Sequence, residues 1–230
     1  ISGAGVKSLA ANLPALRSSV TSNGNITVNS GTLDLGSFTA NRGASTTGGS
    51  LTLASGAFLK IGGANPFPSN YSTVILNLTS TVEYNGTNQT VSAKTYGNLV
   101  LSSSSGAATK TMPATAFTIA KDLTSNIGSG TSVSYTAASS ITVSGNINIG
   151  TSTTFNGASY SHNIAGNWTN NGTFTGTTST INMTGGGSLI SGTGIHNFYN
   201  LIIAGSNIAA AATSNLAVSG DLTTSSPGVF

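Results

Sequence analysis

The 230-residue chain contains no cysteine and very little charge. Without cysteine it has neither disulfides nor thiolate metal ligands, so its stability must come from core packing and backbone hydrogen bonds. Asp, Glu, Lys and Arg make up only 5% of the residues, against roughly 25% in ordinary soluble domains. The surface must therefore consist mainly of Ser, Thr, Asn and Gly.

The few charged residues are also scattered. Seven Lys and Arg oppose four Asp and Glu, for a formal net charge of +3. Nucleic-acid binding needs cations clustered along one face, so we expect no nucleic-acid partner. No apolar run approaches the roughly 18 residues of a membrane helix, so we expect no membrane insertion. The opening ISGAGVKSLA lacks an initiator Met and a signal-peptide pattern, which indicates a mature or excised chain.

Apolar residues nevertheless make up 37% of the chain, which argues against disorder. They alternate with polar residues over short runs, as at Ile26 with Val28 and Ile141 with Val143. This period of two predicts short β-strands. The clusters of Gly, Asn and Ser between the runs suit tight turns. A helix is plausible only at KSLAANLPALRSS, residues 7–19, where Pro14 opposes it.

The sequence also repeats itself. STVEYNGTNQTVSAKTYGNLVLS, residues 80–102, is similar to STINMTGGGSLISGTGIHNFYNLIIA, residues 179–204, with Val82 aligned to Ile181 at a displacement of 99 residues. A partial third copy opens the chain. We therefore divide the chain into imperfect units of about 100 residues, namely 1–100, 101–200 and a partial 201–230.

Strand pairs recur every few residues within each unit, which predicts three short strands and three corners per coil of roughly 20 to 25 residues. The predicted fold is all-β, a single continuous parallel β-helix of about ten short coils over residues 1–230. The alternative is a tandem pair of immunoglobulin-like β-sandwiches, since a unit of this size suits one such domain. Stacked coils place equivalent residues directly above each other, where like charges repel and Asn, Ser and Thr can form ladders.

Three segments carry a resemblance to a known class of protein: NITVNSGTLDLGSFTANR, STVEYNGTNQTVSAKTYGNLVLS and GNWTNNGTFTGTTSTINMTG. They resemble β-helix repeat regions of large bacterial surface and secreted proteins, adhesin-like or autotransporter-like, which are common in Bacteroidetes and related phyla. The resemblance implies a parallel β-helix exported to the cell exterior. It brings no catalytic motif.

Candidate catalytic and metal-binding residues are sparse. The carboxylates are Asp34, Glu83, Asp122 and Asp221, and paired-carboxylate catalysis needs two of them facing each other across a substrate. Asp122 and Asp221 are equivalent in the repeat and are expected several coils apart, as corner residues that accept backbone N–H bonds. His162 and His196 have no Cys, His or acidic neighbour at ligand spacing, and their sequence contexts indicate a corner and a strand entry. We therefore assign no catalytic, cofactor or metal residue and expect no enzyme activity.

Six aromatic residues could form a carbohydrate-binding platform. Their spacing of two favours core or corner packing instead. They are Tyr84, Tyr96, Trp168, Phe174, Phe198 and Tyr199.

The expected function is structural: a non-catalytic subunit or stalk of an extracellular filament. Neither ISGAG nor SSPGVF looks like a charged or amphipathic cap, so the expected partner is a second copy of the chain, stacked head-to-tail through uncapped β-helix ends. The alternative is an adhesin or carbohydrate-binding module that contacts host or matrix glycans, for example through Trp168. Ice binding is a third alternative, although regular Thr-x-Thr rows are not evident.

Overall fold

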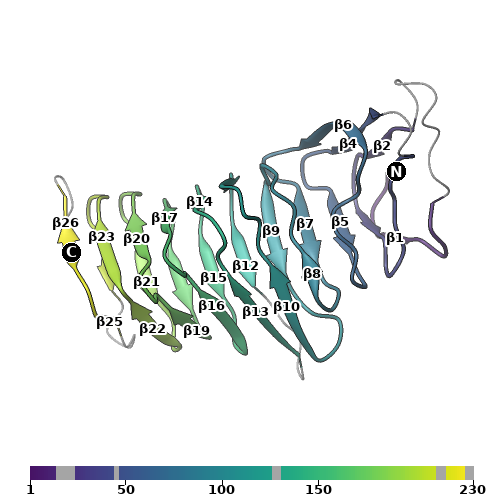
Figure 1. Ribbon diagram of the computed structural model, residues 1–230. Helices are drawn as coiled ribbons and strands as arrows, with labels where there is room; N and C mark the ends of the chain where they lie inside the picture. The colour runs from purple at the N-terminus through teal and green to yellow at the C-terminus, as the bar shows by residue number, and fades with distance from the viewer. Residues whose placement is uncertain (14–23, 44–46, 126–130, 211–215, 226–230) are drawn as a thin grey trace.

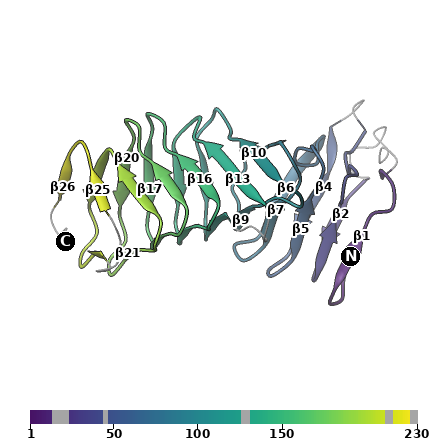
Figure 2. The ribbon, with the colours of Figure 1, turned by 90° about the horizontal axis from the view of Figure 1, so that it is seen from below.

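The computed structural model describes residues 1–13, 24–43, 47–125, 131–210 and 216–225. Within these ranges the chain is all-β, with twenty-six strands and no helix. Residues 14–19 of the segment 7–19, the one place where the sequence allows a helix, lie outside the described residues. Residues 7–13 are not helical, and Lys7 and Ser8 are in a strand. The strands wind into one elongated stack that runs from β1 at one end to β26 at the other (Figures 1 and 2).

The strands form four sheets, and every pairing between them is parallel. The ten-stranded sheet consists of β1 (Val6–Ser8), β3 (Thr32–Asp34), β5 (Phe58–Ile61), β7 (Thr81–Tyr84), β9 (Asn98–Leu101), β12 (Leu123–Ser125), β15 (Ile147–Ile149), β18 (Trp168–Asn170), β21 (Leu189–Ser191) and β24 (Ala209–Ala210). The seven-stranded sheet consists of β8 (Gln89–Thr90), β10 (Ala107–Thr111), β13 (Ser132–Thr136), β16 (Thr153–Asn156), β19 (Thr173–Thr175), β22 (Ile195–Phe198) and β25 (Leu216–Val218). The six-stranded sheet consists of β11 (Phe117–Ile119), β14 (Ile141–Val143), β17 (Ser161–Ile164), β20 (Thr180–Met183), β23 (Asn200–Ile203) and β26 (Leu222–Thr224). The three-stranded sheet consists of β2 (Ile26–Val28), β4 (Gly48–Leu53) and β6 (Tyr71–Leu76).

From β10 onward the chain visits the seven-stranded, six-stranded and ten-stranded sheets in turn and then climbs to the next turn. Each strand therefore pairs with the strand one turn later, as Leu123 does with Ile147. The ten strands of the largest sheet correspond to about nine turns. This arrangement confirms the parallel β-helix, and it is incompatible with antiparallel immunoglobulin-like sandwiches.

The core consists of columns of side chains, one residue from each turn. The main inward column of the ten-stranded sheet is apolar from Leu33 to Ala210: Leu33, Leu59, Val82, Leu99, Leu123, Ile147, Trp168, Ile190 and Ala210. The seven-stranded sheet contributes an aromatic column in which the rings of Tyr135 and Phe155 stack at 4.7 Å and those of Phe155 and Phe174 lie 5.2 Å apart. The alternation recognised in the sequence thus places its apolar residues inside the stack.

Asn and Asp side chains form ladders along the corners. In the ladder that precedes the ten-stranded sheet, the side-chain Oδ1 accepts the backbone N–H of the equivalent residue one turn later. The bonds run from Asp122 N to Asn98 Oδ1 (3.3 Å), from Asn146 N to Asp122 Oδ1 (2.7 Å), from Asn167 N to Asn146 Oδ1 (2.9 Å) and from Leu189 N to Asn167 Oδ1 (2.9 Å). The ladder therefore satisfies corner N–H groups that the sheets leave unpaired.

The turns before β8 have a different cross-section. There the chain alternates between the ten-stranded and three-stranded sheets, and the described residues between β3 and β4 and between β5 and β6 contain no strand on a third face. The expectation of three strands in every coil is therefore wrong for these turns. Between β5 and β6 this face is occupied by segment 62–70, which contains Pro66 and Pro68, residues that cannot donate to a β-ladder.

The turn, and not the 100-residue similarity, is the structural repeat. Val82 lies in the ten-stranded sheet, whereas Ile181, its counterpart in the sequence alignment, lies in the six-stranded sheet. Coil length also varies, from 26 residues between Val6 and Thr32 to 17 between Thr81 and Asn98. The similar segments thus build similar corners on different faces.

The corner ladder generates a testable prediction. Replacing Asn167 by Ala removes the acceptor for the Leu189 N–H and should lower the free energy of unfolding by about 1 kcal/mol. Asn148 is the matched control, because it is exposed on the neighbouring β15 and the described structure gives its side chain no hydrogen bond. Asn148→Ala should change stability by less than about 0.5 kcal/mol. Equal losses in the two variants, measured by chemical denaturation, would contradict a stabilising ladder.

Candidate functional site

The carboxylates Asp34 and Glu83 lie on the outer face of the ten-stranded sheet, with Lys60 directly between them. Register pairs Asp34 with Lys60 and Lys60 with Glu83, so the three charges alternate in sign along one column. Asp34 Oδ1 accepts the backbone N–H of Gly36 (2.8 Å), and Glu83 Oε1 accepts the hydroxyl of Ser102 (2.6 Å). A cation, and not a substrate-sized space, separates the two acids.

The other two acids lie at corners. Asp122 belongs to the corner ladder and accepts both the backbone N–H and the side-chain amide of Asn146. This confirms the expected corner role of Asp122. Asp221 precedes β26 of the six-stranded sheet, whereas Asp122 precedes β12 of the ten-stranded sheet, so the two carboxylates lie at different corners and do not face each other.

Both histidines are in strands and point inward. The placement of His162 at a corner is therefore wrong, whereas His196 lies at a strand entry as expected, as the second residue of β22. Each histidine takes the place of an apolar residue in an alternating run, and this alternation was the sequence signal for its inward position. In β17, His162 Nδ1 accepts the N–H of Ile141 (3.2 Å), and Nε2 therefore carries the proton and donates to Gly157 O (3.0 Å). Burial lowers the pKa of His162, and it also lowers the pKa of His196 in β22. Both imidazoles act as neutral core residues.

In the described ranges, His, Asp and Glu side chains form no group of three or more that could hold a metal ion. The described residues also include no helix long and apolar enough to span a membrane.

Five of the six aromatic residues considered for a glycan platform are core residues: Tyr84, Tyr96, Trp168, Phe174 and Phe198 are at most 1% exposed. The expectation of core packing is confirmed for these five. Tyr199 alone is exposed, at 36%. A contact between Trp168 and a glycan is therefore wrong, because the indole is closed in by Phe174 and Phe198, whose ring centroids lie 4.7 and 5.2 Å from it.

The most unusual group is Lys110, which sequence reasoning missed. Lys110 is only 1% exposed. The sequence did carry a signal for this inward position, because Lys110 lies between Ala108 and Met112 in an alternating run. Its ammonium donates to Gly86 O (2.8 Å), Thr87 O (3.0 Å) and Gln89 Oε1 (2.7 Å). Burial lowers the pKa of Lys110 to about 8, while Glu83 opposes the shift.

Lys110 and Gln89 are the first two inward residues of the seven-stranded sheet, ahead of the aromatic column. Gln89 Nε2 donates to the carbonyl oxygens of Ile61 and Asn65, both at 3.0 Å. Together the two side chains bind carbonyl groups at the end of β5 and in the segments that follow β5 and β7. The network thus joins the two cross-sections of the solenoid and leaves no acceptor or donor arranged for a substrate.

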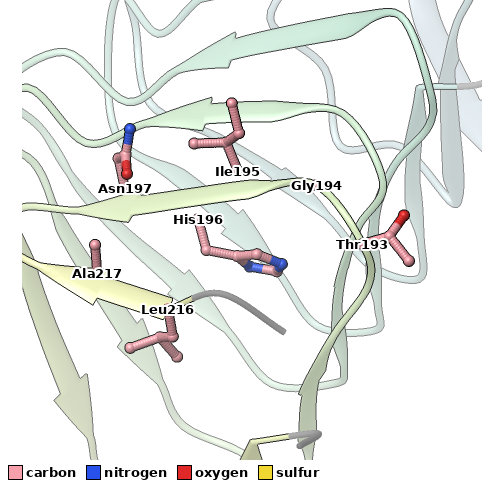
Figure 3. Close-up of a pocket in the computed structure, with 7 residues that line it drawn as sticks. All are labelled: Thr193, Gly194, Ile195, His196, Asn197, Leu216 and Ala217. Atoms are coloured by element: carbon pink, nitrogen blue, oxygen red, sulfur yellow. The ribbon is translucent and has the colours of Figure 1, made fainter. Parts of the chain in front are cut away.

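A hollow with a volume of about 370 Å³ lies along β22 and β25. Figure 3 shows Ile195 and Asn197 projecting from β22 on the side opposite His196. Its lining residues are Thr193, Gly194, Ile195, His196, Asn197, Leu216 and Ala217. One neutral imidazole without an acidic neighbour in this lining supplies neither a catalytic dyad nor a metal site.

Comparisons with protein-family models, with curated proteins and with solved structures find no match for this chain. What it does must therefore be argued from its own geometry.

Lys110 gives a prediction about pH. A Lys pKa of about 8 in the folded state, below the ordinary 10.5, means that the unfolded chain binds more protons between these values, so stability should rise with pH in this window. Measurements should stop at pH 10, because burial raises the pKa values of several tyrosines, that of Tyr71 to about 12, and their ionisation favours unfolding at higher pH.

The matched variant is Lys110→Met, which cannot titrate. Between pH 8 and 10 the free energy of unfolding of the wild type should rise relative to that of the variant by at most about 1.4 kcal/mol per pH unit. Parallel pH profiles of the two proteins in urea denaturation would contradict the buried, proton-releasing lysine.

Proposed function

We propose that the chain is a non-catalytic structural element of the cell exterior, a subunit or stalk that extends a filament by head-to-tail stacking of solenoids. The observation that carries this proposal is the open edge at each end of the described stack. In the described chain β1 pairs only with β3, β24 only with β21, and β26 only with β23. Such edges favour pairing with another strand.

The end formed by β24 to β26 is apolar where a neighbour would stack. Leu222 continues the inward column of Leu201, yet Leu222 is 50% exposed and Leu201 is fully buried. One further turn placed on this end would bury Leu222 as the existing turns bury Leu201. Burial of apolar surface therefore favours extension here.

At the opposite end no charged cap is expected from the sequence, but the structure places a lysine there. Lys7 takes the inward register position of Leu33, and its ammonium donates to Gly3 O and Ala4 O at 3.4 and 2.8 Å. Val6 beside it is 63% exposed. Stacking on this end must use the backbone edge of β1 and keep the Lys7 ammonium at its carbonyl acceptors.

The exterior location is proposed from the resemblance to repeats of bacterial surface proteins. Glycan binding is less well supported, since the aromatic residues expected to carry it lie in the core. Ice binding is also less well supported, because the outward column of the six-stranded sheet changes from Thr118 and Thr142 to Asn163 and Asn182.

The test is concentration-dependent assembly of the purified chain. We expect linear particles one solenoid wide in negative-stain micrographs at high concentration, and their loss in Leu222→Lys, which places a charge on the stacking end. Thr223→Lys is the matched control, because Thr223 lies in the same strand with its side chain on the outer face. Monodisperse single particles of the wild type at every concentration would refute head-to-tail stacking.

A further inference from the structure

One strand edge is open in the middle of the solenoid as well as at its ends. β6 is the last strand of the three-stranded sheet and pairs with β4 on one side only. In the next turn this face has no strand among the described residues, only an isolated β-bridge at Tyr96. The Tyr96 backbone bonds to the β11 side and not to β6: its N–H donates to Thr118 O (3.0 Å) and its C=O accepts from Ala120 N (2.8 Å). Within the described chain, β6 thus has no backbone partner on its second edge.

The backbone groups at this edge follow from the parallel pairing. In a parallel strand the N–H and C=O of one residue point to the same side, and those of the next residue point to the other side. The Asn77 N–H bonds to Leu53 O of β4, so the alternate residues Thr73 and Ile75 also face β4. Val74 and Leu76 therefore present their N–H and C=O groups to the open edge. At the amino end the Gly48 N–H bonds to Asn70 O and Gly48 pairs with Tyr71, so the Ser72 N–H faces β4.

The space beside this edge is wedge-shaped. At the carboxyl end of β6 it is closed, because a Cβ on Gly97 would collide with the carbonyl oxygens of Asn77 and Leu78, and Asn98 N donates to Ser80 O. At the amino end a hollow of about 240 Å³ separates β6 from the next turn. The hollow is lined by Phe67, Pro68, Ser69, Asn70, Tyr71, Val74, Ser92, Ala93 and Lys94.

We infer that the open edge of β6 binds a single extended polypeptide segment of another protein by β-strand addition. The unpaired N–H and C=O groups at Val74 and Leu76 specify an extended backbone, since only a strand offers matching groups at this spacing. Ser92–Lys94 of the next turn form the wall opposite β6, so the incoming segment must be a single strand with no further turns attached beside it. A second copy of the solenoid would bring its neighbouring turns against this wall and is therefore disfavoured.

The side chains around the edge specify the chemistry of the segment. Ile75 and Leu78 are 48% and 52% exposed, so apolar side chains beside them would be stabilised by burial. Lys94 supplies a cation at the amino end of the wedge, with its ammonium 5.7 Å from the centroid of the Phe67 ring. The expected partner is a strand of alternating β-branched residues that carries an acidic side chain near Lys94.

The experiment uses the whole chain and a capped hexapeptide, Glu-Val-Thr-Val-Thr-Val. Backbone amide hydrogen exchange is followed by NMR as the peptide is added. We expect exchange at Val74 and Leu76 to slow, with little change at Ser72, Thr73 and Ile75, whose N–H groups face β4. The same peptide N-methylated at every second residue, on the residues that face β6, should give no protection because its donors are removed.

Two variants separate the backbone and charge contributions. Val74→Pro removes one edge donor at a position that the sheet does not use, which edge strands tolerate, and should weaken binding by about tenfold or more. Lys94→Glu should weaken binding of the Glu peptide and favour a peptide with Lys in its place. Lys121→Glu, an exposed lysine at another corner, is the control and should leave binding unchanged.

Three outcomes would overturn the inference: no protection of the β6 amides at millimolar peptide, equal binding of the N-methylated peptide, or protection that grows with protein concentration alone. The last result would mean that a second copy of the chain occupies the edge. Because β6 lies away from both end turns, these outcomes are independent of head-to-tail stacking.

Discussion

The structure depends on one constraint: each residue lies about one strand spacing, roughly 4.8 Å, from the equivalent residue of the next turn. Apolar side chains gain from this arrangement because they bury one another, as in the column from Leu33 to Ala210. Asn side chains gain because one Oδ1 reaches the N–H of the next turn. Like charges in adjacent positions repel, which accounts for a chain with only 5% charged residues.

The charged residues that do occur obey the same constraint. Asp34, Lys60 and Glu83 alternate in sign along their column, and Asp122 is the single carboxylate of its ladder, with Asn98 and Asn146 on either side. Lys110 is buried where the seven-stranded sheet begins and where carbonyl groups would otherwise lack donors. At these positions charge is placed where stacking needs an opposite charge, a hydrogen-bond acceptor or a donor.

Much of this fold was predictable from the sequence because a period of two and Gly/Asn corners are local signals. The alternation at Ile141 and Val143 predicted both the strand and its buried face. The change of cross-section at β8 was not predictable, because it depends on which turns stack on each other. Likewise, the similarity of Val82 to Ile181 reflected shared corner chemistry, and sequence alone could not place the two residues on different faces. The open edge of β6 arises from a missing strand in the next turn, for which the sequence has no positive signal.

The most direct test of the stacking constraint is Asn146→Asp. The new carboxylate keeps the acceptor for the Asn167 N–H. It also lies against the Asp122 carboxylate, because Asp122 Oδ1 accepts the Asn146 side-chain amide at 3.0 Å in the wild type, so two negative charges become neighbours. We predict a loss of about 1 to 2 kcal/mol in the free energy of unfolding at pH 7 and low salt, recovered when Asp122→Asn is added. A single variant as stable as the wild type, or a double variant no more stable than the single one, would contradict the account.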